Sequence, residues 1–177
     1  MGRSCLLSWI VAVFAAFFMM SGPVSAQMGG NNVQVAGRVA SFLQPPPAGR
    51  IQVAIVYDPG DPASENEARS IERSLGAGLV IGNILLKPKR VASNSLHGLA
   101  GTRVAFVTRG TDYRAIAFAA AARSILTISS DPACAQAGFC TVTISSTPRV
   151  QITVSRAATR AAKLKFSAAF LMLIKEI

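Results

Sequence analysis

Short apolar runs alternate with segments of helical periodicity along the middle of this chain. Three runs are rich in β-branched residues and nearly free of charge: residues 51–57, 103–108 and 124–129. Such runs are typical of strands buried on both faces of a sheet. The segments between them carry apolar residues three and four positions apart, which predicts helices. Strands that alternate with helices favour right-handed crossovers, so we expect an α/β fold with a mainly parallel, Rossmann-like sheet and flanking helices.

The first strand leads into a strand-turn-helix unit. It ends in the turn sequence Asp58-Pro59-Gly60-Asp61-Pro62. Ser64 followed by Glu67 has the spacing of a capping box, so we expect the helix to begin at Ser64. The helix would bury Ala68, Ile71 and Leu75 and end at Gly76.

Other segments of the first two thirds carry weaker signals. Residues 33–43 have apolar positions at helical spacing, and three prolines then stop the helix. Residues 79–92 predict a strand around Ile84–Leu86 or Val91, with Lys87, Lys89 and Arg90 exposed. We expect a short helical turn over 94–99 and an alanine-rich helix that Thr111-Asp112 caps and that runs through Arg123.

The period changes after residue 140. Two short alternating runs, 141–145 and 150–154, flank Ser146-Thr147-Pro148 and predict an antiparallel hairpin. Residues 156–162 should be helical, and Ser167 could cap a last helix over 168–174. One continuous helix from 156 to 175 is the alternative that the spacing allows.

The first 26 residues predict a secretory signal peptide. Arg3 precedes an apolar run over 6–20, and Val24-Ser25-Ala26 supplies small residues for cleavage. An uncleaved membrane anchor is the alternative. We expect an exported, periplasmic chain that begins near Gln27 and forms one α/β domain over 27–177.

The chain is strongly basic. It has 18 Lys plus Arg against 8 Asp plus Glu, and removing Arg3 leaves 17 against 8, a net charge of +9. The predicted export and the shortage of aromatic residues argue against a nucleic-acid partner. Anionic lipid, cell-wall polymer or an acidic protein face would suit the charge better, and a second copy of the chain is a further candidate partner. A basic surface that only keeps the protein in solution is the alternative.

Cys134 and Cys140 are the two cysteines of the predicted mature chain. An oxidising compartment favours a disulfide between them. A structural bridge, a redox-sensitive switch and a metal site all stay open, although the one histidine, His97, is distant in sequence.

Five charged residues follow the predicted strands at their carboxyl ends, where open α/β sheets place ligand crevices. They are the candidates for a polar crevice: Asp58, Asp61, Arg109, Asp112 and Asp131. Turn formation and helix capping explain the aspartates equally well. A second candidate surface, for a partner, is the basic helix face formed by Arg156, Arg160 and Lys163.

Catalytic and cofactor motifs find little support. No G-x-S-x-G elbow accompanies His97, which we expect in a loop. Gly76, Gly78 and Gly82 follow a helix rather than a strand, so they do not predict a dinucleotide site. We therefore expect no catalytic residue, no cofactor and no metal.

The order of features in the last third resembles the YfiR-like family of periplasmic regulators. The resemblance is clearest in SILTISSDP, in the loop with Gly138, and in VQITVSRAATRAAKLKFSAAFLML. Gln44-Pro45, Thr102, Ser155 and Lys163 depart from the family pattern. The resemblance implies a non-enzymatic repressor that contacts the outer part of a membrane-bound diguanylate cyclase and thereby alters cyclic di-GMP signalling and biofilm formation. It also fits a disulfide near Cys134 and Cys140.

Two functions are therefore carried forward. The first is a periplasmic regulator that acts by protein–protein contact. The second is a small solute-binding protein, because IQVAIVYDPGDPASENEA is similar to the opening of sugar- and amino-acid-binding domains.

Overall fold

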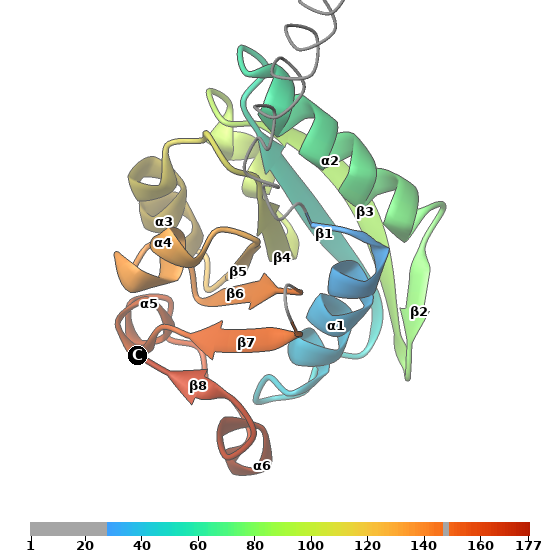
Figure 1. The fold of residues 1–177 in the computed structure, drawn as a ribbon. Coiled ribbons are helices and arrows are strands. Elements are labelled where there is room, and N and C mark those ends of the chain that lie inside the picture. The colour runs from blue at the N-terminus through green and yellow to red at the C-terminus, as the bar shows by residue number, and fades with distance from the viewer. Residues whose placement is uncertain (1–27, 147–148) are drawn as a thin grey trace, which may run out of the picture.

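The computed structural model describes residues 28–146 and 149–177 (Figure 1). The predicted signal peptide and two residues of the predicted hairpin turn, Thr147 and Pro148, lie outside these ranges. The helices are α1 (Gly30–Ser41), α2 (Pro62–Leu75), the 3₁₀ helix η1 (Leu96–Leu99), α3 (Tyr113–Ala121), α4 (Pro132–Gln136), α5 (Arg156–Ala161) and α6 (Ala168–Leu171). The strands are β1 (Gly49–Tyr57), β2 (Leu79–Ile81), β3 (Ile84–Ala92), β4 (Thr102–Val107), β5 (Leu126–Ser129), β6 (Val142–Ser145), β7 (Gln151–Val154) and β8 (Lys175–Glu176).

The described strands form one sheet in the order β2-β3-β1-β4-β5-β6-β7-β8. β3, β1, β4, β5 and β6 are parallel, whereas β2 and β7 run antiparallel to β3 and β6. The predicted α/β fold with a mainly parallel sheet and an antiparallel C-terminal hairpin is therefore confirmed. The order of the parallel strands reverses at β1, because the chain moves outward to β3 and then returns to β4.

Helices cover both faces of the sheet. On the first face, α1 and α2 pack over Ile51, Val53 and Ile55 of β1 (Figure 1). On the second face, η1, α3 and the disulfide loop pack over Ala54 and Val56. This alternation along β1 is the period expected of a strand with two covered faces.

Helix α2 begins earlier than the capping box predicted. Asp61 is the N-cap, its carboxylate accepts from the Ala63 N–H at 2.9 Å, and Pro62 occupies the first turn. Proline suits that position because it lacks an N–H, and an N–H in the first turn has no acceptor within the helix. Ser64 and Glu67 are therefore free for other contacts, and the predicted capping box is wrong.

The C-terminal segment is divided into two short helices. Ser155 caps α5 and Ser167 caps α6, which rules out one continuous helix over 156–175. Lys163 adopts a left-handed φ of 53° just after α5, so it does not share a helix face with Arg156 and Arg160. The last helix ends at Leu171 rather than Ile174, because Lys175 and Glu176 pair with the free edge of β7.

Candidate functional site

The predicted polar crevice lies at the carboxyl edge of the sheet, and its aspartates act there as caps and turn residues. Asp58 accepts from the Gly60 N–H at 2.8 Å. Asp61 and Asp112 are the N-caps of α2 and α3. Asp131 caps α4 and also accepts from the Tyr113 hydroxyl at 2.9 Å. Four carboxylates therefore lie at one edge, each engaged by a neighbouring donor.

The two loops at the strand-order reversal pack directly on each other. Gly110 follows β4 with a φ of 81°, and a Cβ atom there would collide with the carboxylate of Asp61. Behind these loops, Ser64 accepts from the Asp58 N–H at 2.8 Å and contacts the Thr108 hydroxyl at 2.6 Å. Ser64 thus joins the loops after β1 and β4 by hydrogen bonds. Open α/β sheets commonly have a ligand crevice at this position.

Glu67 is the buried centre of this edge, and sequence reasoning missed its role. Its side chain is 1% exposed. The carboxylate accepts from the Met28 N–H at 3.2 Å, the Arg109 N–H at 3.0 Å and the Ser130 hydroxyl at 2.6 Å. The Arg109 Nε lies 3.8 Å away, so a positive charge also faces the carboxylate. The available signal was spacing, because Glu67 precedes Ile71 by four residues on the buried stripe of α2.

Tyr113 completes the network on the α3 side. Burial raises the pKa of its phenol well above the ordinary value, and the hydrogen bond to Asp131 adds to that shift. The phenol therefore stays protonated and donates to Asp131. Hydrogen bonds therefore join α3 to α4 at this edge and α2 to the loop before α4.

The cysteine loop is a buried bridge. Cys134 lies in α4 and is bonded to Cys140, with Cα atoms 5.2 Å apart and side chains 0% and 1% exposed. The predicted disulfide is confirmed. Both sulfurs lie in the core of the second face, between α4 and the start of β6. Burial of this kind is typical of a structural bridge.

His97 is exposed and lies in the 3₁₀ helix η1, whereas the sequence predicted a loop there. Its Nδ1 is 3.3 Å from the Ser95 hydroxyl, two residues before it on the same exposed turn. No third side chain in the described residues orients this pair through a hydrogen bond. Nucleophilic catalysis requires a base that is held in place by such a group, so the Ser95–His97 contact alone does not indicate a catalytic dyad.

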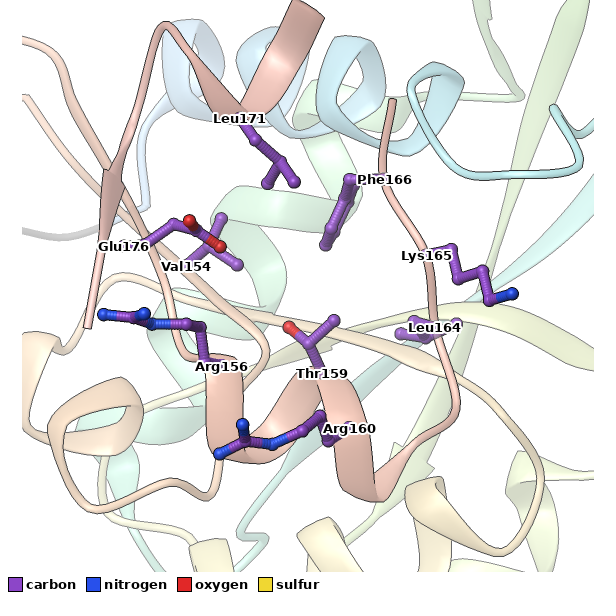
Figure 2. A pocket seen from close by; sticks show the side chains of 9 residues that line it. All are labelled: Val154, Arg156, Thr159, Arg160, Leu164, Lys165, Phe166, Leu171 and Glu176. Atoms are coloured by element: carbon purple, nitrogen blue, oxygen red, sulfur yellow. The ribbon is translucent and has the colours of Figure 1, made fainter. Parts of the chain in front are cut away.

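A pocket of about 370 Å³ opens between β7, α5, α6 and β8. Its walls are mainly apolar: Val154, Leu164, Phe166 and Leu171 (Figure 2). Figure 2 shows Leu171 and Phe166 pointing into the opening from one side and the Glu176 carboxylate pointing into it from the other. Thr159 rises from α5 below. The pocket can therefore hold an apolar group with one polar contact at its side.

Two of the three residues predicted as a partner face lie at the rim of this pocket. The Arg156 and Arg160 guanidinium groups extend from α5 along the rim, while Lys165 points away from the opening (Figure 2). The ion pairs within the described residues join Arg69, Arg90 and Arg109 to glutamates of α2. Arg156 and Arg160 therefore carry charges that are not neutralised by an ion pair in the described part of the chain.

The pocket wall is assembled from distant segments. Residues 164–166 return beside the end of α1, where the Gln44 N–H donates to the Lys165 carbonyl at 2.8 Å and Leu43 bridges Phe166. Phe170 stacks on Phe42 with centroids 5.0 Å apart. These contacts hold Phe166 against the core, so the apolar wall is preformed.

Two absences apply to the described ranges. Within 28–146 and 149–177, no helix is both long and apolar enough to cross a membrane. Across the same residues, no three His, Cys, Asp or Glu side chains gather closely enough to hold a metal ion.

Comparison with known proteins adds the fold alone. No family model matches the sequence, and no curated protein matches it. A crystal structure of a conserved domain protein from Vibrio cholerae O1 biovar El Tor N16961 is similar, with a TM-score of 0.59 and 8% sequence identity. The match covers 83% of this chain and 59% of that one, so the chain spans about three fifths of that neighbour's length.

Proposed function

We propose that this chain is a periplasmic regulatory protein that represses a membrane-bound diguanylate cyclase by protein–protein contact. The observation that carries the proposal is the C-terminal pocket, which combines an apolar interior with two guanidinium groups at its rim that form no ion pair within the described residues. A pocket of this kind is typical of the centre of a protein interface, where an apolar side chain of one partner fills a pocket of the other. The segment that builds the pocket is also the one that resembles YfiR-like regulators. This resemblance supports the choice of partner.

The surface around the pocket has the composition of an interface. Met172 and Leu173, which follow α6, are 82% and 81% exposed. They extend the apolar area beyond the pocket, and Arg156 and Arg160 add charge beside it. Apolar anchors with arginine at the margin are enriched at protein interfaces. The buried Cys134–Cys140 bridge fits the oxidising compartment in which such a contact would form.

The proposed role involves no catalysis. Support comes from the carboxyl edge of the sheet, where Glu67 and the aspartates of the described residues are engaged in caps and internal hydrogen bonds. Regulation would then follow from binding, with signals of the cell envelope altering how much of the chain is bound.

The test uses a strain that lacks the chain and is complemented with variants. Loss of the chain should raise cyclic di-GMP, and the wild type should restore it. Leu171→Glu places a charge in the pocket wall and should fail to restore it. Phe118→Glu changes an equally apolar side chain, 81% exposed on α3, and should restore it fully.

Binding is measured in the same strains by cross-linking and recovery of the chain. The wild type should recover one membrane cyclase, and Leu171→Glu should not. The proposal would be contradicted if cyclic di-GMP is unchanged in the deletion strain and no inner-membrane signalling protein is recovered.

A small solute is the second candidate occupant of the same pocket. Its volume of about 370 Å³ falls in the range of small-molecule sites. A thermal-shift screen of metabolites distinguishes the two, because a ligand that fills the pocket stabilises the native state. Stabilisation that Leu171→Glu abolishes, with normal cyclic di-GMP in the deletion strain, would favour solute binding.

A further inference from the structure

Among the described residues, a helix covers one end of the sheet on one face only. β1 and β3 begin in register at Gly49 and Ile84, whereas the first residue of β4, Thr102, pairs with Gln52. The amino-terminal halves of β1 and β3, with β2 at the edge, therefore extend beyond the rest of the sheet. We call this part, residues 49–52, 79–81 and 84–87, the overhang.

Helix α1 covers the first face of the overhang. A Cβ atom at Gly37 would lie 2.9 Å from Ile81 Cγ1 and 3.1 Å from Leu86 Cδ1, so the helix approaches these side chains closely. Ile51 and Leu86 are buried beneath it. Side chains alternate along a strand, so the neighbours of Ile51 and Leu86 point to the opposite face.

The opposite face of the overhang is open and basic. Strand register places Arg50 beside Leu85, Gln52 beside Lys87, and Ala54 beside Lys89. Val80 pairs with Leu85 on the same face and is 66% exposed. Arg50, Gln52 and Lys89 are exposed, and Lys87 is half-buried. The open face thus presents the cations Arg50 and Lys87 and the exposed Val80. Lys89 points to the same side of β3 at the margin of this face, beside the covered Ala54.

The acids of the chain lie elsewhere. Its eight Asp and Glu residues are three glutamates of α2, four aspartates at the carboxyl edge, and Glu176 of β8. Arg90, also in β3, points to the first face and pairs with Glu65 at 2.6 Å. Arg50, Lys87 and Lys89 take part in no ion pair within the described residues. Like charges held together on one face favour an anionic partner.

We propose that the open face of the overhang docks on the anionic phospholipid surface of a membrane. Long lysine side chains can reach lipid headgroups while their stems lie on apolar surface. Val80 adds an apolar contact at the headgroup boundary, as interfacial segments do. Nucleic acid fits less well, because the open face has no aromatic side chain for base stacking.

This surface is separate from the C-terminal pocket. The overhang includes β2, at one edge of the sheet, whereas the pocket involves β7 and β8 at the other edge (Figure 1). A chain docked through the overhang would therefore keep the pocket open to a membrane-bound partner. Docking would raise the local concentration of the chain beside that partner.

Vesicle flotation tests the proposal with the full chain, expressed with its own N-terminal segment and purified as the cell processes it. Vesicles that contain phosphatidylglycerol should bind the chain, and pure phosphatidylcholine vesicles should not. The triple variant Arg50→Gln, Lys87→Gln, Lys89→Gln should bind about 100-fold more weakly, roughly fivefold for each cation removed. Binding should also fall as salt rises, because ions screen exposed charges.

A matched variant keeps the net charge the same as in the triple variant. Arg38, Arg73 and Arg114 are exposed on α1, α2 and α3, and their replacement by Gln should leave vesicle binding nearly unchanged. Equal losses in the two triple variants would overturn the proposal in favour of unspecific charge attraction. Absence of binding to phosphatidylglycerol vesicles, with binding to a soluble polyanion or an acidic protein, would overturn it in favour of that partner.

A fluorescent reporter locates the contact independently. The one tryptophan of the sequence, Trp9, lies in the predicted signal peptide. Val80→Trp therefore puts a single indole on the overhang, and its emission should shift to shorter wavelength with phosphatidylglycerol vesicles. Asn66→Trp, exposed on α2 over the first face, should show no shift. A shift at Asn66→Trp and none at Val80→Trp would contradict docking through the overhang.

Discussion

The Ser130 hydroxyl donates a hydrogen bond of 2.6 Å to the carboxylate of Glu67, a residue 63 positions earlier in the chain. The bond joins α2 to the loop that leaves β5. The Arg109 N–H brings the loop after β4 to the same carboxylate, and the Met28 N–H brings the segment before α1. Glu67, a buried acid of α2, thus connects four parts of the chain by hydrogen bonds where the strand order reverses.

Replacing Glu67 should cost much of the stability of the domain. Glu67→Ala leaves the donors of Met28, Arg109 and Ser130 without their acceptor, which should lower the free energy of unfolding by about 3 kcal/mol. Glu67→Gln keeps one acceptor oxygen and should cost about 1 kcal/mol. Urea unfolding followed by circular dichroism measures both.

The control is a glutamate five residues further along α2. Glu72 is 45% exposed on its side chain and has one ion pair at 3.8 Å. Glu72→Ala should therefore cost less than about 1 kcal/mol. Equal costs at Glu67 and Glu72 would show that the buried network contributes little.

We predict that the chain is exported and that its mature form begins at Gln27. Met28 is fully buried, and its N–H donates to Glu67, so a cut beyond Met28 would remove a core side chain. The small residues at 24–26 place the cut just before that anchored segment. Intact-mass measurement on the periplasmic fraction checks the start, and a full-length chain retained in the membrane would contradict it.

Removal of the Cys134–Cys140 bridge should destabilise the domain by about 2 kcal/mol, because the closed loop is short. We expect the double variant Cys134→Ser, Cys140→Ser to fold and to unfold at lower urea concentration. Both cysteines are at most 1% exposed, so a mild reductant should leave the native bridge intact. Rapid reduction of the native protein with altered cyclic di-GMP would instead support a redox switch.

The contact between Arg90 and Glu65 should make stability depend on pH in the acid range. The hydrogen bond from Arg90, at 2.6 Å, is the main cause that lowers the pKa of Glu65 below its ordinary value of 4.5. A lowered pKa favours the folded state above pH 4.5, and this contribution is lost as the pH falls below that value. The stability difference between wild type and Arg90→Gln should therefore be constant at neutral pH and shrink in acid.

An NMR titration of the Glu65 carboxyl group tests the cause directly. In Arg90→Gln the pKa of Glu65 should rise toward its ordinary value, although Arg69 stays 3.1 Å from the carboxylate. Arg73→Gln, which removes an exposed charge from the same helix, should leave the titration unchanged. An unshifted pKa in Arg90→Gln would show that the contact does not form in solution.

Local sequence patterns predicted most of the helices and strands, and the three central strands show why. Residues 51–57, 103–108 and 124–129 became β1, β4 and β5 within two residues at either end. Their β-branched runs suit only a strand that is covered on both faces. Gly76 ends α2 with a φ of 54°, and Asp112 caps α3, because these functions depend on the backbone nearby.

Misplaced boundaries arose where two local signals competed. Ser64 and Glu67 have the spacing of a capping box, but Asp61-Pro62 precedes them and starts α2 first. Ser64 and Glu67 then point inward, where Thr108 and Ser130 lie. No local pattern shows those partners, since they come from the ends of other strands.

The sequence by itself determined the α/β class, the central strands, the hairpin, the basic charge and the candidate cysteine pair, since each depends on residues close together in the chain. Tertiary structure decided what the charged residues do. It turned Glu67 into a buried acceptor, placed Gly110 against Asp61 at the edge where the crevice was expected, and brought Phe166 and Leu171 together around a pocket beside Arg156. It also left Arg50 and Lys87 on an open sheet face, because β4 begins three residues after β1 in register. Sites of this kind are formed by residues far apart in sequence, so only the packing of sheet and helices can create them.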